Sequence, residues 1–182
     1  MWYVIQIFTG EEEIMKQLCE RRIPEEIINR CFIPKYQQER RYEGQWHKEE
    51  KILFPGYLFI DTEAPAELGN ALKKTGRFTR LLGDSSCLQP LSQAETAFLQ
   101  KFGGEDQVVE MSYGILENAT VTITDGPMKG MEGCIRKINR HKRWAEIEVH
   151  MFGQLVKARV GLGIVEKKTT ASQGAADKTA VE

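Results

Sequence analysis

The chain has 182 residues, a net charge of −1 and 28% charged against 41% hydrophobic residues, which is typical of a globular protein of one medium domain or two small ones. No apolar run approaches the roughly 20 residues of a membrane-spanning helix, and no basic segment precedes the apolar start, so we expect a cytoplasmic protein. Its 4 cysteines contain no Cys-x-x-Cys pair and its 3 histidines form no ligand cluster, so we predict no metal site and no cofactor.

Strand and helix signals alternate from the start of the chain. Residues 2–8 form an apolar, β-branched and aromatic run, which predicts a strand. Over residues 11–23 apolar side chains recur with helical spacing, and glutamates begin and arginines end the segment, which predicts a helix stabilised by its dipole. Pro24 opens a second short helix, residues 31–37 predict a strand, and the polar residues 39–51 predict a protruding hairpin.

The same alternation continues to a pair of glycines near residue 104. Residues 52–60 are apolar enough for a central strand, residues 65–74 predict a short helix, and residues 78–82 predict another strand. Ser-Gln-Ala-Glu at residues 92–95 is a capping box that opens a further helix. Together these elements predict an α+β domain over residues 1–104.

The second domain is predicted from residues 121–133, an alternating strand followed by a turn with one proline and three glycines, which lets the backbone reverse twice. Two further strands hinge at Phe152-Gly153, so we predict a small all-β barrel over residues 118–167. Residues 105–117 have mixed polarity without a period, which indicates a linker. Residues 168–182 carry almost no large apolar side chain, which predicts a disordered tail.

The two domains differ in charge. Residues 1–110 carry 14 Lys and Arg against 18 Asp and Glu, a sum of −4, whereas residues 118–166 carry 8 against 5, a sum of +3. A basic barrel suits contacts with phosphates. Basic barrels are also common among proteins with other partners, so charge alone does not identify a nucleic-acid site.

The succession of motifs resembles the NusG family over residues 1–166. The matching segments are Trp2-Tyr3-Val4, Phe54-Pro55-Gly56-Tyr57, residues 76–83, residues 90–92 and the KOW-like residues 125–133. The resemblance implies an RNP-like NGN α/β sandwich that binds the clamp helices of bacterial RNA polymerase, followed by a small KOW (SH3-like) barrel. Family positions lining the apolar pocket for those helices match Tyr57 and Phe59, with Trp2, Tyr3 and Phe78 nearby, and residues 61–66 match a contact on the opposite side of the cleft.

Core packing is the alternative interpretation of Tyr57 and Phe59. Strand alternation places both rings on one face, and aromatic residues in a buried strand are more often core residues than binding residues. The order of the motifs, rather than the chemistry of the two rings, therefore favours the binding interpretation.

Two segments indicate a specialised paralogue similar to the LoaP antiterminators, a group whose KOW domain is associated with binding an RNA hairpin. In the barrel segment, several basic residues flank one tryptophan. This combination suits RNA, because phosphates are bound by Lys or Arg and an unstacked base is bound by an aromatic face. The residues predicted to bind RNA are Lys129, Arg136, Lys137, Arg140, His141, Lys142, Arg143 and Trp144. The alternative is a solvated hairpin tip with Trp144 folded back onto the barrel.

The second segment is the predicted hairpin of the first domain. Its residues Arg40, Arg41, Trp46, His47 and Lys48 are candidates for contact with the displaced non-template DNA strand. Glutamates are interspersed among these cations and reduce the net positive field. An exposed hairpin without a nucleic-acid partner is therefore the alternative.

The sequence thus predicts a monomeric, non-enzymatic transcription antitermination or elongation factor that serves specific operons and has no membrane partner. One alternative is a general NusG whose barrel docks ribosomal or termination-factor proteins. A second is a ribosomal assembly protein, which leaves residues 54–60 unexplained. A third is an enzyme, but Glu146, Glu148 and His150 share one strand face, where exposure to solvent explains them without catalysis.

Overall fold

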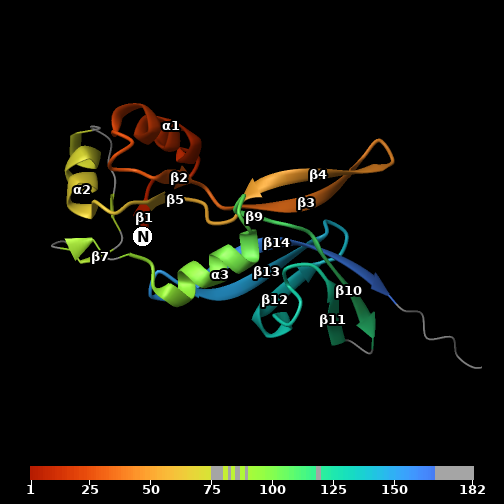
Figure 1. Ribbon diagram of the computed structural model, residues 1–182. Coiled ribbons are helices and arrows are strands. Elements are labelled where there is room, and N and C mark those ends of the chain that lie inside the picture. Colours follow the sequence, from red (N-terminus) through yellow and green to blue (C-terminus); the bar gives the residue numbers. More distant parts are fainter. Residues whose placement is uncertain (75–79, 82, 85–86, 89, 118–119, 167–182) are drawn as a thin grey trace, which may run out of the picture.

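The computed structural model describes residues 1–74, 80–81, 83–84, 87–88, 90–117 and 120–166. An α+β amino-terminal domain and a carboxyl-terminal β domain, called here the barrel, lie against each other (Figure 1), which confirms the predicted fold class. The elements in chain order are β1 (Trp2–Gln6), α1 (Glu12–Arg22), β2 (Arg30–Phe32), β3 (Lys35–Tyr42), β4 (Gln45–Ile52), β5 (Tyr57–Asp61), α2 (Pro65–Lys74), β6 (Arg80–Leu81), β7 (Gly83–Asp84), β8 (Cys87–Leu88), α3 (Gln93–Gly103), β9 (Val108–Val109), β10 (Ser112–Glu117), β11 (Thr120–Asp125), η1 (Glu132–Cys134), β12 (Ile135–Asn139), β13 (Trp144–Met151) and β14 (Gln154–Glu166).

A four-stranded sheet in the order β2-β5-β1-β6 forms the centre of the amino-terminal domain. Side chains alternate across the antiparallel strands β1 and β5. Ile5 and Leu58 are paired and belong to a buried cluster that includes residues of α1 and α2. Val4 and Phe59 are also paired but belong to a second cluster with α3 and the barrel. Helices α1 and α2 therefore cover one face of the sheet, whereas α3 and the barrel cover the other.

The hairpin of β3 and β4 extends from the side of this sheet, as predicted (Figure 1). Its turn has φ of 49° at Glu43 and 79° at Gly44, the left-handed pair that matches the twist of a two-residue hairpin. β3 also pairs in parallel with β9, through Lys35 and Val108. The connection to the barrel is thereby fixed to the base of the hairpin.

The barrel is a five-stranded sheet in the order β11-β10-β14-β13-β12. Strands β13 and β14 form a long hairpin whose turn has φ of 58° at Phe152 and 69° at Gly153. At Gly126, φ is 95° and a Cβ would clash with the backbone of Met111 and Ser112, so this corner requires glycine. The buried Met128 closes the corner, and its N–H donates to Ser112 Oγ at 3.0 Å.

Helix α3 lies between the two domains and joins their cores (Figure 1). Its predicted capping box is confirmed, because the Glu95 N–H donates to Ser92 Oγ and the Ser92 N–H donates to Glu95 Oε2. Leu99 and Phe102 of this helix belong to one hydrophobic cluster with Ile147 and Val160 of the barrel. A single core therefore crosses the domain boundary. None of the helices in the described ranges is long and apolar enough to cross a membrane.

Two local expectations need correction, and a third concerns residues outside the described ranges. The short helix expected after Pro24 is a turn in which the N–H groups of Ile27 and Ile28 donate to the Pro24 carbonyl, because the chain enters β2 before a helix can propagate. The linker expected over residues 105–117 contains β9 and β10, since long-range pairing supplies strand structure that local polarity does not reveal. The predicted tail at residues 168–182 lies outside the described residues.

Candidate functional site

Five aromatic side chains gather on the barrel side of the amino-terminal sheet. We call this group the aromatic face, and its members are Trp2, Phe32, Phe54, Tyr57 and Phe59. Phe32 stacks on Phe59 with ring centroids 5.5 Å apart, and Trp2 meets Phe32 edge-on at 4.9 Å. Tyr57 and Phe59 share one side of β5, as alternation predicted, because both pack into the cluster opposite to that of Leu58. Rings in such contact form a continuous apolar surface.

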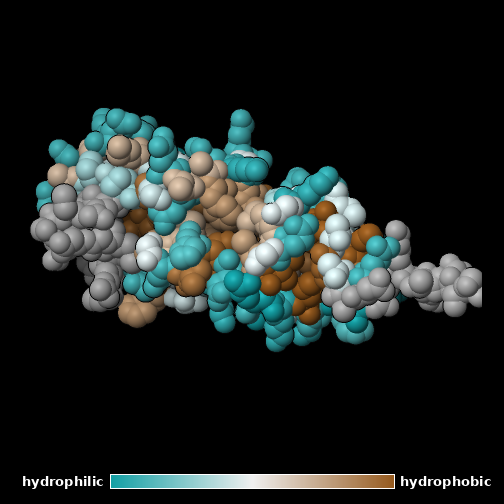
Figure 2. Space-filling view, turned by 90° about the horizontal axis from the view of Figure 1, so that it is seen from below, coloured by the Kyte–Doolittle hydropathy of each residue, from teal (hydrophilic) through white to brown (hydrophobic). Residues whose placement is uncertain are grey.

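Phe152, in the turn between β13 and β14, covers the aromatic face. Its ring stacks on Tyr57 at 4.7 Å with an interplanar angle of 23°, and it lies 5.8 Å from Phe54 and 5.9 Å from Phe59. Phe59 is fully buried beneath this layer. From below, apolar residues are visible between polar groups at the junction of the domains and on the barrel (Figure 2). The chain is therefore in a closed arrangement, in which the barrel occupies the predicted pocket.

Glu95 of α3 fastens the same turn. The Phe152 N–H donates to Glu95 Oε1 at 2.5 Å, while the Ser92 hydroxyl and N–H donate to Oε2. Burial raises the pKa of Glu95, but the hydrogen bonds from Ser92, Phe152 and Gly153 outweigh it and hold the pKa below its ordinary value. The contribution of this carboxylate is therefore present at neutral pH and is lost only as the pH falls through the lowered pKa.

Tyr3, which was predicted to lie near the pocket, stands apart from the aromatic face. Tyr3 is buried in β1, but alternation places it on the same side as Ile5, the side that α1 and α2 cover. The placement of Tyr3 beside the pocket is thus corrected, because Trp2 and Tyr3 are neighbours in a strand and point to opposite faces. Phe78 lies outside the described residues.

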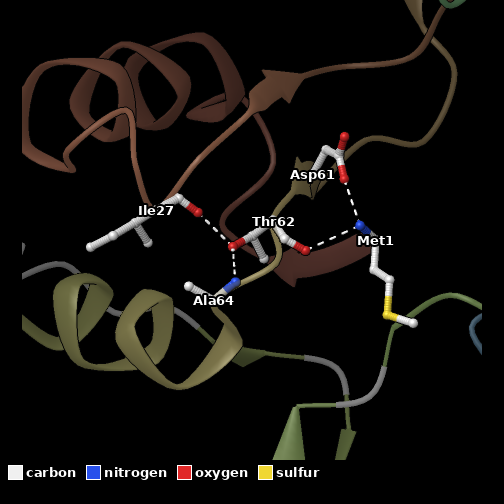
Figure 3. Close-up of polar contacts among 5 residues, drawn as sticks. All are labelled: Met1, Ile27, Asp61, Thr62 and Ala64. Atoms are coloured by element: carbon white, nitrogen blue, oxygen red, sulfur yellow. Dashed lines mark hydrogen bonds and ion pairs between the residues drawn. The ribbon is translucent and has the colours of Figure 1, made fainter.

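The stretch at residues 61–66, expected to contact the opposite side of a cleft, is held by the start of the chain (Figure 3). The Met1 ammonium donates to Asp61 Oδ1 at 2.7 Å and to the Thr62 carbonyl at 3.1 Å. Thr62 Oγ1 donates to the Ile27 carbonyl at 2.5 Å and accepts the Ala64 N–H at 2.9 Å. These bonds order the turn that leads into α2.

The side chains of the basic group on the barrel differ in exposure. The exposed ones are Lys129, Arg136, Lys137, Arg140, His141 and Lys142. Trp144 is only 8% exposed, with the Lys137 ammonium 6.0 Å and the Arg159 guanidinium 4.7 Å from its ring centroid. This arrangement matches the alternative in which Trp144 folds back onto the barrel. The ring therefore offers no open face to a base.

Arg143 points toward the amino-terminal domain instead of the solvent. Its guanidinium donates to Glu39 of β3 and lies 3.7 Å from the ring centroid of Trp46 of β4. Glu39 also accepts the hydroxyl of Tyr113 at 2.9 Å, and Gln38 Nε2 donates to the carbonyl of the residue before Arg143 at 2.7 Å. The segment predicted to bind RNA and the hairpin predicted to meet DNA are therefore in direct contact.

Residues 40–48, around the turn of the hairpin, are exposed. Arg40, Arg41, His47 and Lys48 all face solvent, and Arg40 forms an ion pair of 3.8 Å with Glu49. Such an exposed pair leaves both side chains accessible to a ligand.

The carboxylates considered for catalysis make ordinary surface ion pairs. Glu148 accepts a hydrogen bond from Arg136 at 2.8 Å, which lowers the pKa of its carboxyl, and Glu146 pairs with Lys157 at 3.9 Å. Among the residues that the structure describes, no group of three His, Cys, Asp or Glu side chains could hold a metal ion. The geometry of this strand face therefore supports structural roles for these carboxylates.

Sequence reasoning missed Phe152, Glu95, Glu39 and Tyr113 as interface residues. The sequence predicts only a hinge at Phe152-Gly153. The available signal was an aromatic residue at the first position of a two-residue turn, where Asn or Gly is usual and a large ring needs a packing partner. Glu39 gave no comparable signal, because its partners lie far away in the sequence.

Comparison with known proteins finds relatives that match this chain in sequence and in fold. A family model described as "Transcription termination factor nusG" matches residues 1–100. The chain is 25% identical over 172 residues to a Pseudomonas aeruginosa protein named transcription termination/antitermination protein NusG, covering 91% of this chain and 97% of that one. The Thermus thermophilus protein of the same name is 28% identical over 166 residues, covering 84% and 90%. A solved structure titled "Domain interaction in Thermotoga maritima NusG" shares the fold, with a TM-score of 0.56, 20% identity, and coverage of 88% of this chain and 92% of that one.

Proposed function

The chain belongs to the NusG family, and from that premise we propose that it is an antitermination factor that binds RNA polymerase through the aromatic face and an RNA hairpin through the barrel. In this role it acts in the cytoplasm as a monomer and promotes processive transcription of specific operons. Proteins named transcription termination/antitermination protein NusG match most of its length, which supports the general activity. The specific partners are our proposal.

The observation that carries the polymerase contact is the position of Tyr57. This ring lies at the domain boundary, half-buried, and the side chain that stacks on it belongs to the barrel. The barrel covers this apolar surface of the amino-terminal domain. When the two domains separate, the whole surface becomes available to a partner. Trp2 and Phe54 extend the same surface, which gives it the aromatic composition of an interface hot spot.

Tyr57→Ala is expected to weaken polymerase binding by roughly 2 kcal/mol, about thirtyfold, because the ring is an aromatic anchor. The change also removes the ring on which Phe152 stacks, so it is best measured in a Phe152→Ala background, where that contact is already absent. Ile14→Ala, at an exposed position of α1, is the matched control. Affinity for purified polymerase in a pull-down or by biolayer interferometry is the measurement. Equal binding by the two double variants would show that the aromatic face is not part of the interface with polymerase.

The proposed RNA contact is supported by the exposed cations around residues 136–142. Lys137, Arg140 and Lys142 face solvent, and Lys129 is exposed at the neighbouring corner. Their charges suit the phosphates of a folded RNA. Because Trp144 is covered, we assign recognition in the closed form to charge and shape, without base stacking on the indole.

Arg140→Ala and Lys142→Ala are each expected to lower affinity for many RNAs alike, and to reduce the slope of log affinity against log salt by about 0.7 to 0.9. Lys16→Ala, on α1 of the other domain, is the control and should leave the slope unchanged. Fluorescence anisotropy at several salt concentrations gives both quantities. If the chain does not bind RNA but its barrel binds a ribosomal or termination-factor protein, the result would favour the alternative function, that of a general NusG.

We also propose that the hairpin contacts the displaced non-template DNA strand through Arg40, Arg41, His47 and Lys48. Their exposure supports this role, since single-stranded nucleic acid is bound by cations and stacking surfaces together. Trp46, which is 41% exposed although the Arg143 guanidinium lies 3.7 Å from its ring centroid, supplies the stacking surface.

A further inference from the structure

A cavity of about 590 Å³ lies between the base of the β3–β4 hairpin and strands β13 and β14 of the barrel. Residues of the loop that precedes α1 complete its lining. None of the contacts proposed above with polymerase, RNA or DNA uses a residue of this lining. Cavities of roughly 300 to 1,000 Å³ that combine apolar walls with a few convergent polar groups are typical binding sites for small molecules. Both kinds of group line this cavity.

The apolar wall of the cavity comes from the end of β4 and the residues after it. Ile52, Leu53 and Pro55 contribute to it. Leu53 belongs to the core that joins the two domains, and Ile52 packs against the core beneath α1 and α2. Because close-packed cores lie behind these side chains, the wall is held in one shape. It suits a ring of low polarity.

Arg159 supplies a positive charge that is held in place without a carboxylate. Its guanidinium lies 4.7 Å from the ring centroid of Trp144, and it forms no ion pair with any residue that the structure describes. A guanidinium that stacks on an aromatic face keeps its N–H donors available at its edge. Trp144 is buried, so the stack positions the guanidinium before a ligand arrives and reduces the entropy that is lost on binding.

Tyr36 supplies an uncharged donor to the same cavity. Its side chain is only 4% exposed, yet its hydroxyl makes no hydrogen bond within the described part of the chain. A hydroxyl that is largely removed from water is costly until an acceptor pairs with it. Burial raises the pKa of Tyr36, and the nearby charge of Arg159 opposes this only in part, so the hydroxyl is a protonated donor at neutral pH.

Two lysines lie beside these donors. Lys51 is the partner of Tyr36 across β3 and β4, so the two side chains share one face of the hairpin. Lys157 lies two residues before Arg159 on one face of β14. Each lysine makes an ion pair with a glutamate, of 3.8 Å and 3.9 Å. Exposed pairs of this kind are weak enough for either ammonium to turn toward a phosphate.

Three carboxylates of the lining differ in how far they are engaged. Both oxygens of Glu12 accept backbone N–H groups at 2.7 Å, from Gly10 and Gly56. Glu146 is the ion-pair partner of the lysine on β14. Glu50 is exposed and forms no ion pair with the residues that the structure describes. Glu50 is therefore the acceptor that remains for the hydroxyl groups of a ligand.

From these groups we infer that the cavity binds a mononucleotide, with its phosphate between Arg159 and Tyr36, its ribose hydroxyls toward Glu50 and its base along the apolar wall. A phosphate is a strong charged acceptor for guanidinium and hydroxyl donors. A bare anion would fill only a small part of 590 Å³ and would leave the wall and Glu50 without a partner. The inference does not rest on the RNA binding proposed above, because the exposed cations assigned to RNA lie outside this lining.

The first test is a comparison of whole nucleotides with their parts. The four ribonucleoside 5′-monophosphates are titrated separately into the full-length chain by isothermal calorimetry, alongside inorganic phosphate, ribose 5-phosphate and the four nucleosides. At least one nucleotide is expected to bind about tenfold more tightly than phosphate, ribose 5-phosphate or its own nucleoside. The reason is that only the whole ligand meets the cationic donors and the apolar wall together.

Tyr36→Phe removes only a hydroxyl that has no hydrogen-bond partner among the described residues, so the fold should be retained. The variant is expected to lower nucleotide affinity roughly twofold to tenfold, the effect of one neutral hydrogen bond. Tyr42→Phe makes the same change on the same strand at a residue that is 63% exposed and outside the cavity, and it is the matched control.

Arg159→Gln removes the charge and is expected to lower nucleotide affinity about tenfold to a hundredfold, because hydrogen bonds to charged groups are stronger. Arg21→Gln, at an exposed position of α1, is its control. Circular dichroism and thermal unfolding verify that each variant is folded before its affinity is compared.

Each outcome decides the inference. It is overturned if none of the four nucleotides binds, if phosphate alone binds as tightly as the best nucleotide, or if Tyr36→Phe and Arg159→Gln bind as well as their controls. A nucleotide that binds more tightly than its parts, and that both variants weaken relative to their controls, supports it. The RNA function is measured separately with Arg140→Ala and Lys142→Ala, so either proposal can fail while the other stands.

Discussion

Replacing Phe152 with alanine is expected to open the chain and raise its apparent affinity for polymerase. The ring contacts three members of the aromatic face, Phe54, Tyr57 and Phe59, so its loss removes the centre of the interface. Truncating a packed phenylalanine costs about 3 kcal/mol or more, which multiplies the ratio of open to closed molecules by about a hundred or more. Apparent affinity rises in proportion to the open fraction, until that fraction approaches one.

The control for Phe152→Ala is Leu155→Ala, which shortens an exposed side chain of β14 close to the turn of the same hairpin. Polymerase affinity by interferometry and domain tumbling by magnetic resonance relaxation are measured for both variants. Unchanged affinity in Phe152→Ala, with tumbling of two separate domains, would show that the covered surface is not the polymerase site. Unchanged tumbling would show that other contacts hold the domains together.

Gly161→Ala is expected to separate the domains by a different route, steric exclusion. A Cβ at this position would clash with the backbone carbonyl of Gln37 in β3 and with the sulfur of Met111. The backbone of Gly161 is not in the left-handed region, so alanine fits the strand itself and the conflict lies in the docking. Forcing extra atoms into a packed interface costs roughly 1 to 3 kcal/mol, up to about a hundredfold in the closed population.

Gly133→Ala is the matched control, because a Cβ there would meet nothing within 4 Å and the backbone is not left-handed. Small-angle scattering should show a larger radius of gyration for Gly161→Ala, and thermal unfolding should resolve two transitions where the closed chain gives one. A compact Gly161→Ala protein with a single unfolding transition would mean that β3 and Met111 shift to make room for the added methyl group. The close approach of Gly161 would then not be required for the domains to stay together.

Local pattern was sufficient for several of the elements and for the shared face of Tyr57 and Phe59 in β5. Alternation in residues 57–60 placed Tyr57 and Phe59 together, and the capping box at Ser92 located the start of α3. These features depend on residues a few positions apart, where periodicity and hydrogen-bonding chemistry act directly.

Contacts across the domain boundary could not be predicted in this way. The ion pair between Glu39 and Arg143 joins residues 104 positions apart, and Phe152 meets Glu95 across 57 positions. By itself, Glu39 looked like a solvated residue and Phe152 like part of a hinge. Glu95 was predicted only as a member of the capping box, and Arg143 only as part of the basic segment. Trp144 illustrates the same limit, because its neighbour Gly161 in the sheet and the cation of Arg159 over its ring come from β14.

The short connection between β9 and β10 sets how strongly a partner must compete with the barrel. β9 is paired to β3, and only two residues separate the end of β9 from the start of β10, so Phe152 remains tethered close to its own binding surface. A short tether of this kind gives an effective concentration of about millimolar. A partner that is a thousandfold more dilute must therefore bind about a thousandfold more tightly than Phe152 docks, merely to occupy the surface half of the time. Weak docking is thus enough to keep the pocket covered in a tethered molecule, and the same barrel supplied as a separate chain at cellular concentration would leave it open.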